Sequence, residues 1–204
     1  MAEHDSGYHL LFSNPKLVED LFRSFVPEPW VEHLDFATLE RVNAKLHADN
    51  LERRDGDIIY RVSHTHGTHV YLYLLLEFQS TPDYWMAVRV GTYVFLLYQH
   101  LIREQLITAE AGLPPVFPLV LYNGDAPWNA ATDLSKLLNL AEGTPLRAWQ
   151  PKIKYYLLEE RRHSESKEDS LSALLFALEH CRHRGQLAQL VKQLANHLTH
   201  PQDA

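Results

Sequence analysis

Two acidic residues and an amide stand at the ends of two neighbouring apolar segments. Asp57 opens one short apolar run, and Glu77-Phe78-Gln79 closes the next. Carboxylate and carbonyl oxygens are the ligands that a hard cation such as Mg²⁺ prefers. These residues could therefore surround one divalent cation, and a cation held in this way can promote hydrolysis of a phosphodiester bond.

The two segments are expected to form a β-hairpin. Residues 57–63 are rich in β-branched and aromatic residues, and residues 70–79 are nearly continuous in apolar residues. The stretch between them is polar and contains Gly67, which suits a tight connection. This pattern predicts two antiparallel strands.

The register of the hairpin decides how close the acids lie. A turn centred on His66 places Asp57 opposite Leu75. Moving the centre of the turn by one residue moves the partner by two and places Asp57 opposite Glu77. Directly opposed residues lie roughly 5 Å apart at Cβ, and diagonal ones roughly 7–8 Å. Side chains alternate between faces, so Glu77 and Gln79 share a face. One cation could reach all three side chains.

Composition indicates one globular domain, which a small helical segment could extend. The chain has 204 residues, of which 46% are hydrophobic, enough for a sizeable core. Its apolar runs are strand-length, which predicts no membrane-spanning helix. The polar, acidic N-terminus is unlike a secretory signal. The single cysteine, Cys181, can form no internal disulfide, which fits a cytoplasmic protein.

Charge is unevenly distributed along the chain. The net charge of −7 argues against a simple nucleic-acid binder. Residues 1–146 carry 10 basic and 19 acidic side chains, whereas residues 147–192 carry 9 basic and 6 acidic ones. The second part could supply a basic face, or simply a solvated helical surface. Its candidate basic residues are Arg147, Lys152, Lys154, Arg161, Arg162, Arg182 and Arg184.

The remaining pattern predicts an α/β protein with a mixed sheet of about four strands, flanked by helices. Pro118 lies within one predicted strand and indicates a strand end or an edge position. Glu159 and Glu160 are expected on the surface. The other predicted elements are a helix within 8–30 that starts at Asn14-Pro15, a helix or edge strand within 33–47, a helix from Tyr84 to about Glu110, a strand at 116–122, a short helix at 132–141, a strand or helix start at 154–158, and a helix from Leu171 to about Leu198 with a potential break at Gly185.

A helix, a hairpin that carries Asp and then Glu-x-Lys, and a further helix and strand form the core plan of PD-(D/E)XK nucleases. Within that superfamily the chain resembles the Rpn family, the recombination-promoting nucleases also described as YhgA-like transposases. The resemblance covers roughly residues 4–160. It is carried by His4-Asp5 with Phe12-Ser13-Asn14-Pro15 and Asp20-Leu21, by residues 57–62, by residues 71–80, and by residues 118–124 with Pro127-Trp128.

The resemblance implies a metal-dependent DNA endonuclease that acts in recombination or mobile-element transposition. Its catalytic residues map onto Asp57, Glu77 and Gln79. Mg²⁺, or another divalent cation such as Mn²⁺ or Ca²⁺, would be held by Asp57, Glu77 and the backbone carbonyl of Phe78. Gln79 stands where the superfamily has lysine. Glutamine can orient water but cannot act as a general base.

The resemblance also implies DNA as the partner. Arg61, from the same strand as Asp57, is a candidate phosphate contact, as are Lys152 and Lys154. Nucleases of this fold often act as dimers, so a homodimer is expected. We assign residues 1–160 to the nuclease-like domain and residues 161–204 to a C-terminal helical extension.

Two alternatives stay open. The chain could be a non-catalytic DNA- or protein-binding module on a degenerate nuclease fold, which Gln79 and the acidic balance favour. His64, His66 and His69 crowd the hairpin turn and could bind zinc. Without a further ligand at suitable spacing, surface histidines are the favoured interpretation.

Overall fold

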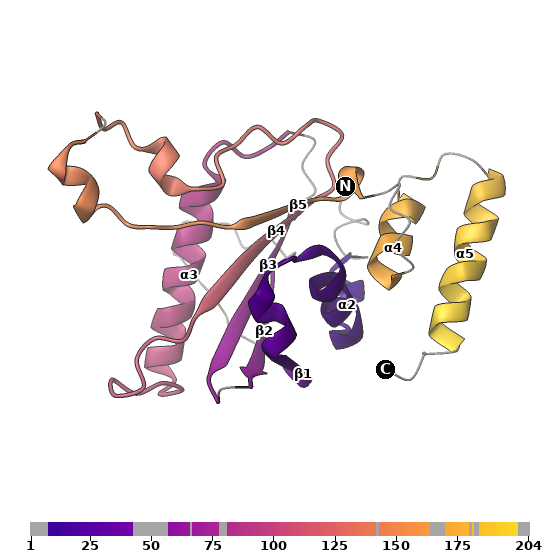
Figure 1. The fold of residues 1–204 in the computed structure, drawn as a ribbon, viewed down its shortest axis with the longest axis horizontal. Coiled ribbons are helices and arrows are strands. Elements are labelled where there is room, and N and C mark those ends of the chain that lie inside the picture. Colours follow the sequence, from indigo (N-terminus) through magenta and orange to yellow (C-terminus); the bar gives the residue numbers. More distant parts are fainter. Residues whose placement is uncertain are drawn as a thin grey trace.

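A five-stranded mixed sheet forms the centre of the molecule (Figure 1). The structure is a computed structural model that describes residues 8–42, 57–65, 67–77, 81–141, 143–163, 170–179, 181 and 184–199. The strand order follows the sequence. The strands are β1 (Leu34–Arg41), β2 (Asp57–His64), β3 (His69–Glu77), β4 (Val116–Tyr122) and β5 (Tyr156–Glu159). The pairs β1–β2 and β2–β3 are antiparallel, and the pairs β3–β4 and β4–β5 are parallel.

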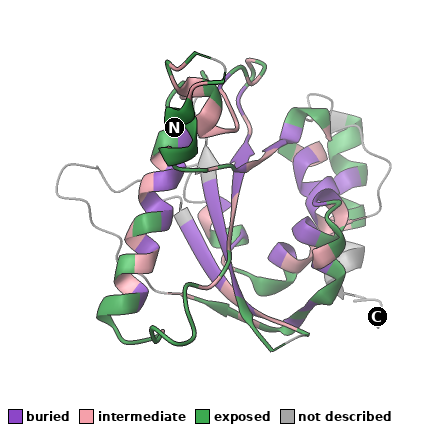
Figure 2. Cartoon of the chain, turned by 60° about the vertical axis from the view of Figure 1, so that its left-hand side comes forward, coloured by how far each residue is buried: buried purple, intermediate pink, exposed green. Residues whose placement is uncertain are grey.

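Helices cover both faces of this sheet (Figure 2). One face packs against α3 (Met86–Arg103), and the other packs against α2 (Pro15–Phe25) and α4 (Leu171–Glu179), with α5 (Arg184–Thr199) beyond α4. The described residues also form a helical turn at 8–11 and four short 3₁₀ segments: η1 (Pro29–His33), η2 (Leu134–Leu137), η3 (Pro145–Trp149) and η4 (Glu160–Arg162). The predicted α/β class is confirmed, with five strands rather than about four. None of the described helices has the length and apolarity needed to cross a membrane.

Burial on both faces explains the continuous apolar run of β3. Leu72 and Leu74 belong to the core cluster under α2, whereas Tyr71, Tyr73 and Leu75 belong to the cluster under α3. Since successive side chains of a strand point to opposite faces, a strand covered on both faces needs apolar residues at every position.

The predicted hairpin is confirmed, and its register is the one with Asp57 opposite Leu75. The connection contains Gly67 with a φ of 83°. Glycine adopts this left-handed conformation at little cost. The structure thus selects one of the two registers that the sequence left open.

Element boundaries differ from the prediction where local chain geometry intervenes. The predicted helix start at Asn14-Pro15 is confirmed, because the Asn14 side chain accepts a hydrogen bond from the Lys16 amide at 3.0 Å. The ambiguous segment 33–47 contains the edge strand β1. Helix α3 ends at Arg103, earlier than predicted, because Gln105 has a φ of 55° and leaves the helical conformation.

Three further predictions need correction. Residues 132–141 contain only the 3₁₀ turn η2. Gly185 does not break a helix, since α4 ends at Glu179 and Gly185 lies in the first turn of α5. Pro118 lies in a central strand, but β4 starts to pair with β5 only at Leu119. That side of β4 is still open at Pro118, so the missing N–H costs no ladder bond to β5.

Candidate active site

Several strand ends with acidic residues meet at one edge of the sheet. Because β3, β4 and β5 are parallel, their carboxyl ends lie side by side, and Glu77 pairs with Tyr122, which pairs with Glu159. Strand β2 runs the other way, so its first residue, Asp57, reaches the same edge. Crevices at the carboxyl ends of parallel strands are common ligand sites.

The register places Asp57 and Glu77 in diagonal positions. Asp57 lies opposite Leu75, two residues before Glu77, and diagonal positions are roughly 7–8 Å apart at Cβ. Positions two apart share a face, so both belong to the face on which Leu75 packs under α3. The side chains of Asp57 and Glu77, and all of Phe78 and Gln79, lie outside the described part of the chain.

An aromatic cluster holds the loop that follows β4 against this edge. Tyr122 is buried, and its hydroxyl donates to the carbonyl oxygen of Ala126 at 2.9 Å. Its ring lies 4.8 Å from that of Trp128, which in turn lies 6.3 Å from that of Tyr155. Burial raises the pKa of Tyr155 to about 12, with a lowering contribution from Trp128 and a raising one from the Asp83 carboxylate. Tyr155 therefore stays protonated.

Glu159 was expected on the surface, and this expectation is wrong. Glu159 is only 9% exposed. Its Oε2 accepts a hydrogen bond from the Trp128 amide at 3.2 Å, and its Oε1 pairs with Arg162 at 2.9 Å. Arg161 also donates to the carbonyl oxygen of Asp125 at 2.6 Å. These contacts engage both carboxylate oxygens of Glu159 and fix the loop after β4. Sequence reasoning missed them because nothing local marks them.

The turn between β3 and α3 is fixed by Asp83. Its Oδ1 accepts a hydrogen bond from the Trp85 amide at 2.8 Å, and its Oδ2 pairs with Arg89 at 3.2 Å. The Arg89 side chain is only 12% exposed. Sequence reasoning missed the pair of Asp83 and Arg89. The Ser-Thr-Pro-Asp segment before the helix is the local signal that could have indicated a capping turn here.

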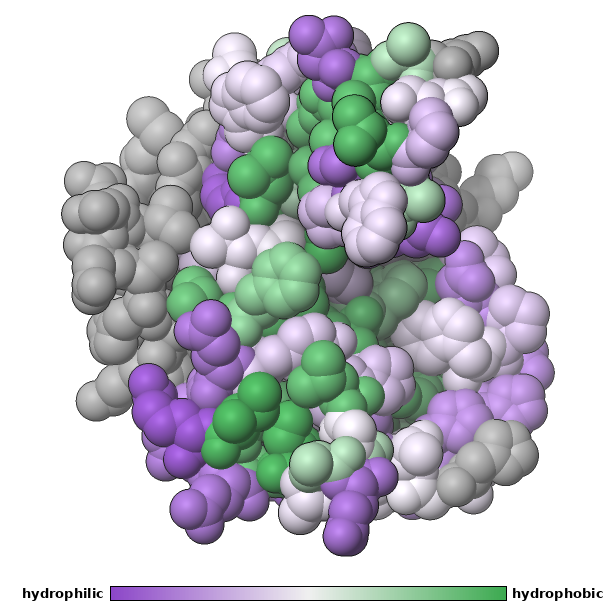
Figure 3. All heavy atoms as spheres, turned by 90° about the vertical axis from the view of Figure 1, so that its left-hand side faces the viewer, coloured by the Kyte–Doolittle hydropathy of each residue, from purple (hydrophilic) through white to green (hydrophobic). Residues whose placement is uncertain are grey.

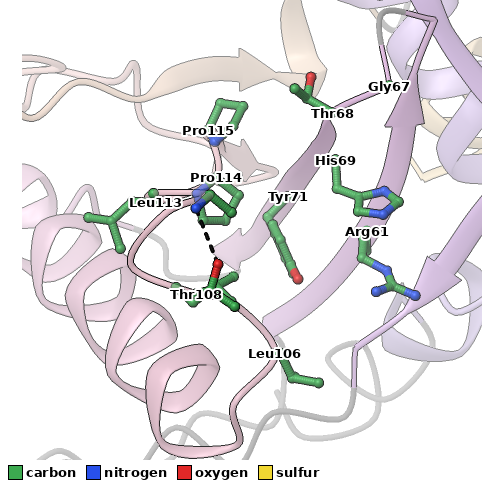
Figure 4. Close-up of a pocket in the computed structure, with 13 residues that line it drawn as sticks. Arg61, Gly67, Thr68, His69, Tyr71, Leu106, Thr108, Leu113, Pro114 and Pro115 are labelled. Atoms are coloured by element: carbon green, nitrogen blue, oxygen red, sulfur yellow. Dashed lines mark hydrogen bonds between the residues drawn. The ribbon is translucent and has the colours of Figure 1, made fainter.

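Arg61 lies away from the acidic edge. It stands four residues beyond Asp57 in β2, which corresponds to about 13 Å along a strand. Its guanidinium pairs with Glu40 at 2.5 Å, and this hydrogen bond raises its pKa. Together with His69 and Tyr71 it lines a pocket of about 350 Å³ near the hairpin turn (Figure 4). The structure therefore does not bring Arg61 to the acids.

Lys152 and Lys154 flank a residue that packs against α3. A Cβ placed on Gly91 would lie 3.2 Å from Cγ1 of Ile153, so the chain crosses the helix at this point. Lys152 is exposed, and Lys154 is 78% exposed with its Nζ 3.4 Å from Oδ2 of Asp133. The structure thus places these two predicted DNA contacts beside the first half of α3.

No group of three His, Cys, Asp or Glu side chains that could hold a metal ion occurs among the described residues. The side chains of Asp57 and Glu77 do not belong to that set. At the hairpin, the ring of His64 stacks on that of His33 at 5.7 Å, and His69 lies 3.4 Å from the Ser63 hydroxyl. His66 lies outside the described residues.

Comparison with known proteins identifies the family of the chain. The family described as "Putative transposase, YhgA-like" matches residues 2–204. The chain belongs to this family. The resemblance predicted from the sequence is therefore confirmed. No solved structure matches the chain.

Curated relatives of this YhgA-like chain carry nuclease names. It is 28% identical over 121 residues to the recombination-promoting nuclease RpnA of Escherichia coli (strain K12), covering 59% of the chain and 40% of the relative. It is 27% identical over 124 residues to RpnC of the same strain, covering 60% and 39%. It is 26% identical over 129 residues to RpnD of Escherichia coli O157:H7, covering 62% and 48%. The chain thus matches less than half the length of each relative.

Proposed function

We propose that this chain is a metal-dependent DNA endonuclease that acts in recombination or transposition. The observation that carries the proposal is the pair of registers that bring Asp57 and Glu77 to one edge of the sheet. The match to the YhgA-like family and the nuclease names of three relatives support it.

The backbone geometry fits a divalent cation. Diagonal carboxylates at roughly 7–8 Å between Cβ atoms can converge on one ion, and the Phe78 carbonyl would add a third oxygen. Mg²⁺, Mn²⁺ or Ca²⁺ would suit this oxygen set. The bound cation would neutralise charge on the scissile phosphate and acidify water.

Gln79 has a more limited role than lysine would have. Its amide can donate a hydrogen bond to a phosphate oxygen and accept one from water, but it carries no charge. We therefore assign Gln79 to positioning water and phosphate. The loop after β4, held by Glu159 and Tyr122, would border the proposed site on the side of β5.

Plasmid cleavage tests the proposal. The purified chain should nick or linearise supercoiled DNA with Mg²⁺, Mn²⁺ or Ca²⁺, and a chelator should stop it. Asp57→Ala and Glu77→Ala should each reduce the rate about a hundredfold or more. Asp125→Ala is the matched control, because Asp125 is an exposed residue of the loop after β4, and the variant keeps the backbone carbonyl that accepts the hydrogen bond from Arg161. Undiminished cleavage by Glu77→Ala would overturn the site.

A second candidate is a non-catalytic DNA- or protein-binding module. Gln79 in place of lysine and the net charge of −9 over residues 1–146, from 10 basic and 19 acidic side chains, favour it. Titration calorimetry with Mn²⁺, with and without DNA, separates the two candidates, because the module would show no divalent affinity. A cytoplasmic location and a homodimer remain predictions, and sedimentation of the purified chain would test the second.

A further inference from the structure

Two adjacent aromatic side chains are exposed beside the candidate active site. Tyr84 is 60% exposed and Trp85 is 58% exposed, and their rings lie 4.8 Å apart at an angle of 89°. They occupy the turn between the end of β3 and the start of α3. Large aromatic rings that stay in water without covering a core often mark a binding surface.

The turn that carries these rings is held in place. Asp83 accepts a hydrogen bond from the Trp85 amide and pairs with the mostly buried Arg89 of α3. The buried Tyr155 packs in one core cluster with Met86 and Ala87, the first residues of α3, so the turn lies close to the chain that enters β5. Binding to the two rings would therefore require little ordering of this part of the backbone.

Positive side chains flank the same part of α3. Ile153 packs on Gly91, and its neighbours Lys152 and Lys154 are both exposed. Figure 3 views the side of the molecule on which α3 lies, where apolar patches are bordered by hydrophilic ones. Exposed aromatic rings beside lysines can bind a nucleic-acid strand by stacking its bases and contacting its phosphates.

We propose that Tyr84 and Trp85 form a stacking platform for unpaired bases of DNA, with Lys152 and Lys154 along the phosphates. The inference rests on the proposed function and names its substrate class as single-stranded or locally unpaired DNA. Bases within a duplex are already stacked on each other and offer no free face to a ring. A strand bound on this turn would run next to the carboxyl end of β3.

Oligonucleotide binding without catalysis tests the inference. Fluorescence anisotropy is measured with a labelled single strand and with its blunt duplex, in a chelator so that no cleavage occurs. Wild type should bind the single strand more tightly than the duplex. The double variant Tyr84→Ala/Trp85→Ala should bind the single strand about tenfold or more weakly, with duplex binding little changed.

Three variants separate stacking from other roles of the rings. Phe95→Ala is the matched control, because Phe95 is a 51% exposed aromatic further along α3, and it should bind like wild type. Tyr84→Phe/Trp85→Phe keeps both aromatic rings and should retain binding. Tyr84→Leu/Trp85→Leu keeps apolar surface without rings and should lose affinity as the alanine pair does.

The outcomes distinguish this inference from the proposed function. Equal single-strand affinity of wild type and the alanine pair, or absence of DNA binding by wild type, would overturn the platform. Unchanged DNA binding together with altered sedimentation of the alanine pair would show a contact between copies of the chain and would overturn it too. Oligonucleotide binding without metal-dependent plasmid cleavage would instead overturn the proposed function and leave the platform standing.

Discussion

Glu160 is a fully buried carboxyl group that the proposed chemistry does not use. It begins η4 with none of its surface exposed, and its Oε2 accepts a hydrogen bond from the Tyr8 hydroxyl at 3.0 Å. Burial raises its pKa to about 8, the Tyr8 hydrogen bond opposes this, and the nearby Glu179 carboxylate adds to it. The expectation that Glu160 lies on the surface is therefore wrong.

This raised pKa predicts a pH-dependent stability. The folded state holds the Glu160 proton up to about pH 8, whereas the unfolded state releases it near the ordinary value of 4.5. The stabilising contribution of this group is therefore complete below pH 4.5 and is lost as the pH rises to about 8. Glu160→Gln keeps an acceptor for Tyr8 without titrating. Its free energy of unfolding relative to wild type should rise by a few kcal/mol between pH 5 and pH 8.

Urea unfolding followed by tryptophan fluorescence at both pH values measures this difference. Glu32→Gln is the matched control, since Glu32 is exposed, and it should show the pH dependence of wild type. A stability difference between Glu160→Gln and wild type that stays constant from pH 5 to pH 8 would contradict the prediction.

At the scale of elements, one carboxylate joins two helices that are far apart in sequence. Asp20 of α2 accepts hydrogen bonds from the amides of Leu171 at 3.2 Å and Ser172 at 2.6 Å, and so caps the start of α4. Phe25 of α2 and Phe176 of α4 pack nearby, with ring centroids 5.3 Å apart. Helix α4, which lies beyond the predicted domain boundary at residue 160, therefore packs on α2, which lies before that boundary.

Removal of this cap should weaken the α2–α4 contact. Asp20→Ala leaves two amides of the first turn of α4 without their side-chain acceptor, so the free energy of unfolding should fall by about 1–2 kcal/mol. Glu19→Ala is the matched control on the same helix, because Glu19 forms an i,i+4 ion pair with Arg23, and such a pair is worth about 0.5 kcal/mol or less. Urea unfolding monitored by circular dichroism compares them. Equal losses in both variants would refute the capping role.

Local patterns predicted those parts of the fold whose causes are local. The apolar run of β3, the turn with Gly67 and the Asn14-Pro15 start of α2 each follow from nearby residues. The register that places Asp57 diagonally to Glu77 was one of two alternatives, because both satisfy the alternation of faces. Only the packed structure distinguishes them.

Contacts between distant residues could not be predicted in this way. Glu159 is held by Trp128, which is 31 residues away, and Glu160 by Tyr8, which is 152 residues away. Isolated acids near a strand end look solvated in a sequence, since acids are rarely buried unless paired. Arg61 was predicted to act with Asp57 because both residues belong to one strand, but four residues of extended chain keep them apart.

At the scale of the whole molecule, the proposed function requires an acidic protein to bind an anionic polymer, and only a limited surface could serve. The net charge is −7, so general attraction to DNA is weak and local lysines matter more. Lys152 and Lys154 are exposed beside α3. Each lysine that contacts a phosphate releases condensed counterions, which makes the affinity depend on salt.

The salt dependence of DNA binding therefore measures whether these lysines contact phosphates. Lys152→Ala/Lys154→Ala should weaken oligonucleotide binding alike for different base sequences, because phosphates carry no sequence information. It should also reduce the slope of log affinity against log salt concentration by about 1.4 for a single strand, because each of the two lost phosphate contacts contributes about 0.7. Lys16→Ala/Lys192→Ala removes two exposed lysines from α2 and α5 and should leave the slope unchanged. Loss of phosphate contacts must reduce counterion release. An unchanged slope for Lys152→Ala/Lys154→Ala would therefore mean that DNA binds to another surface of the protein.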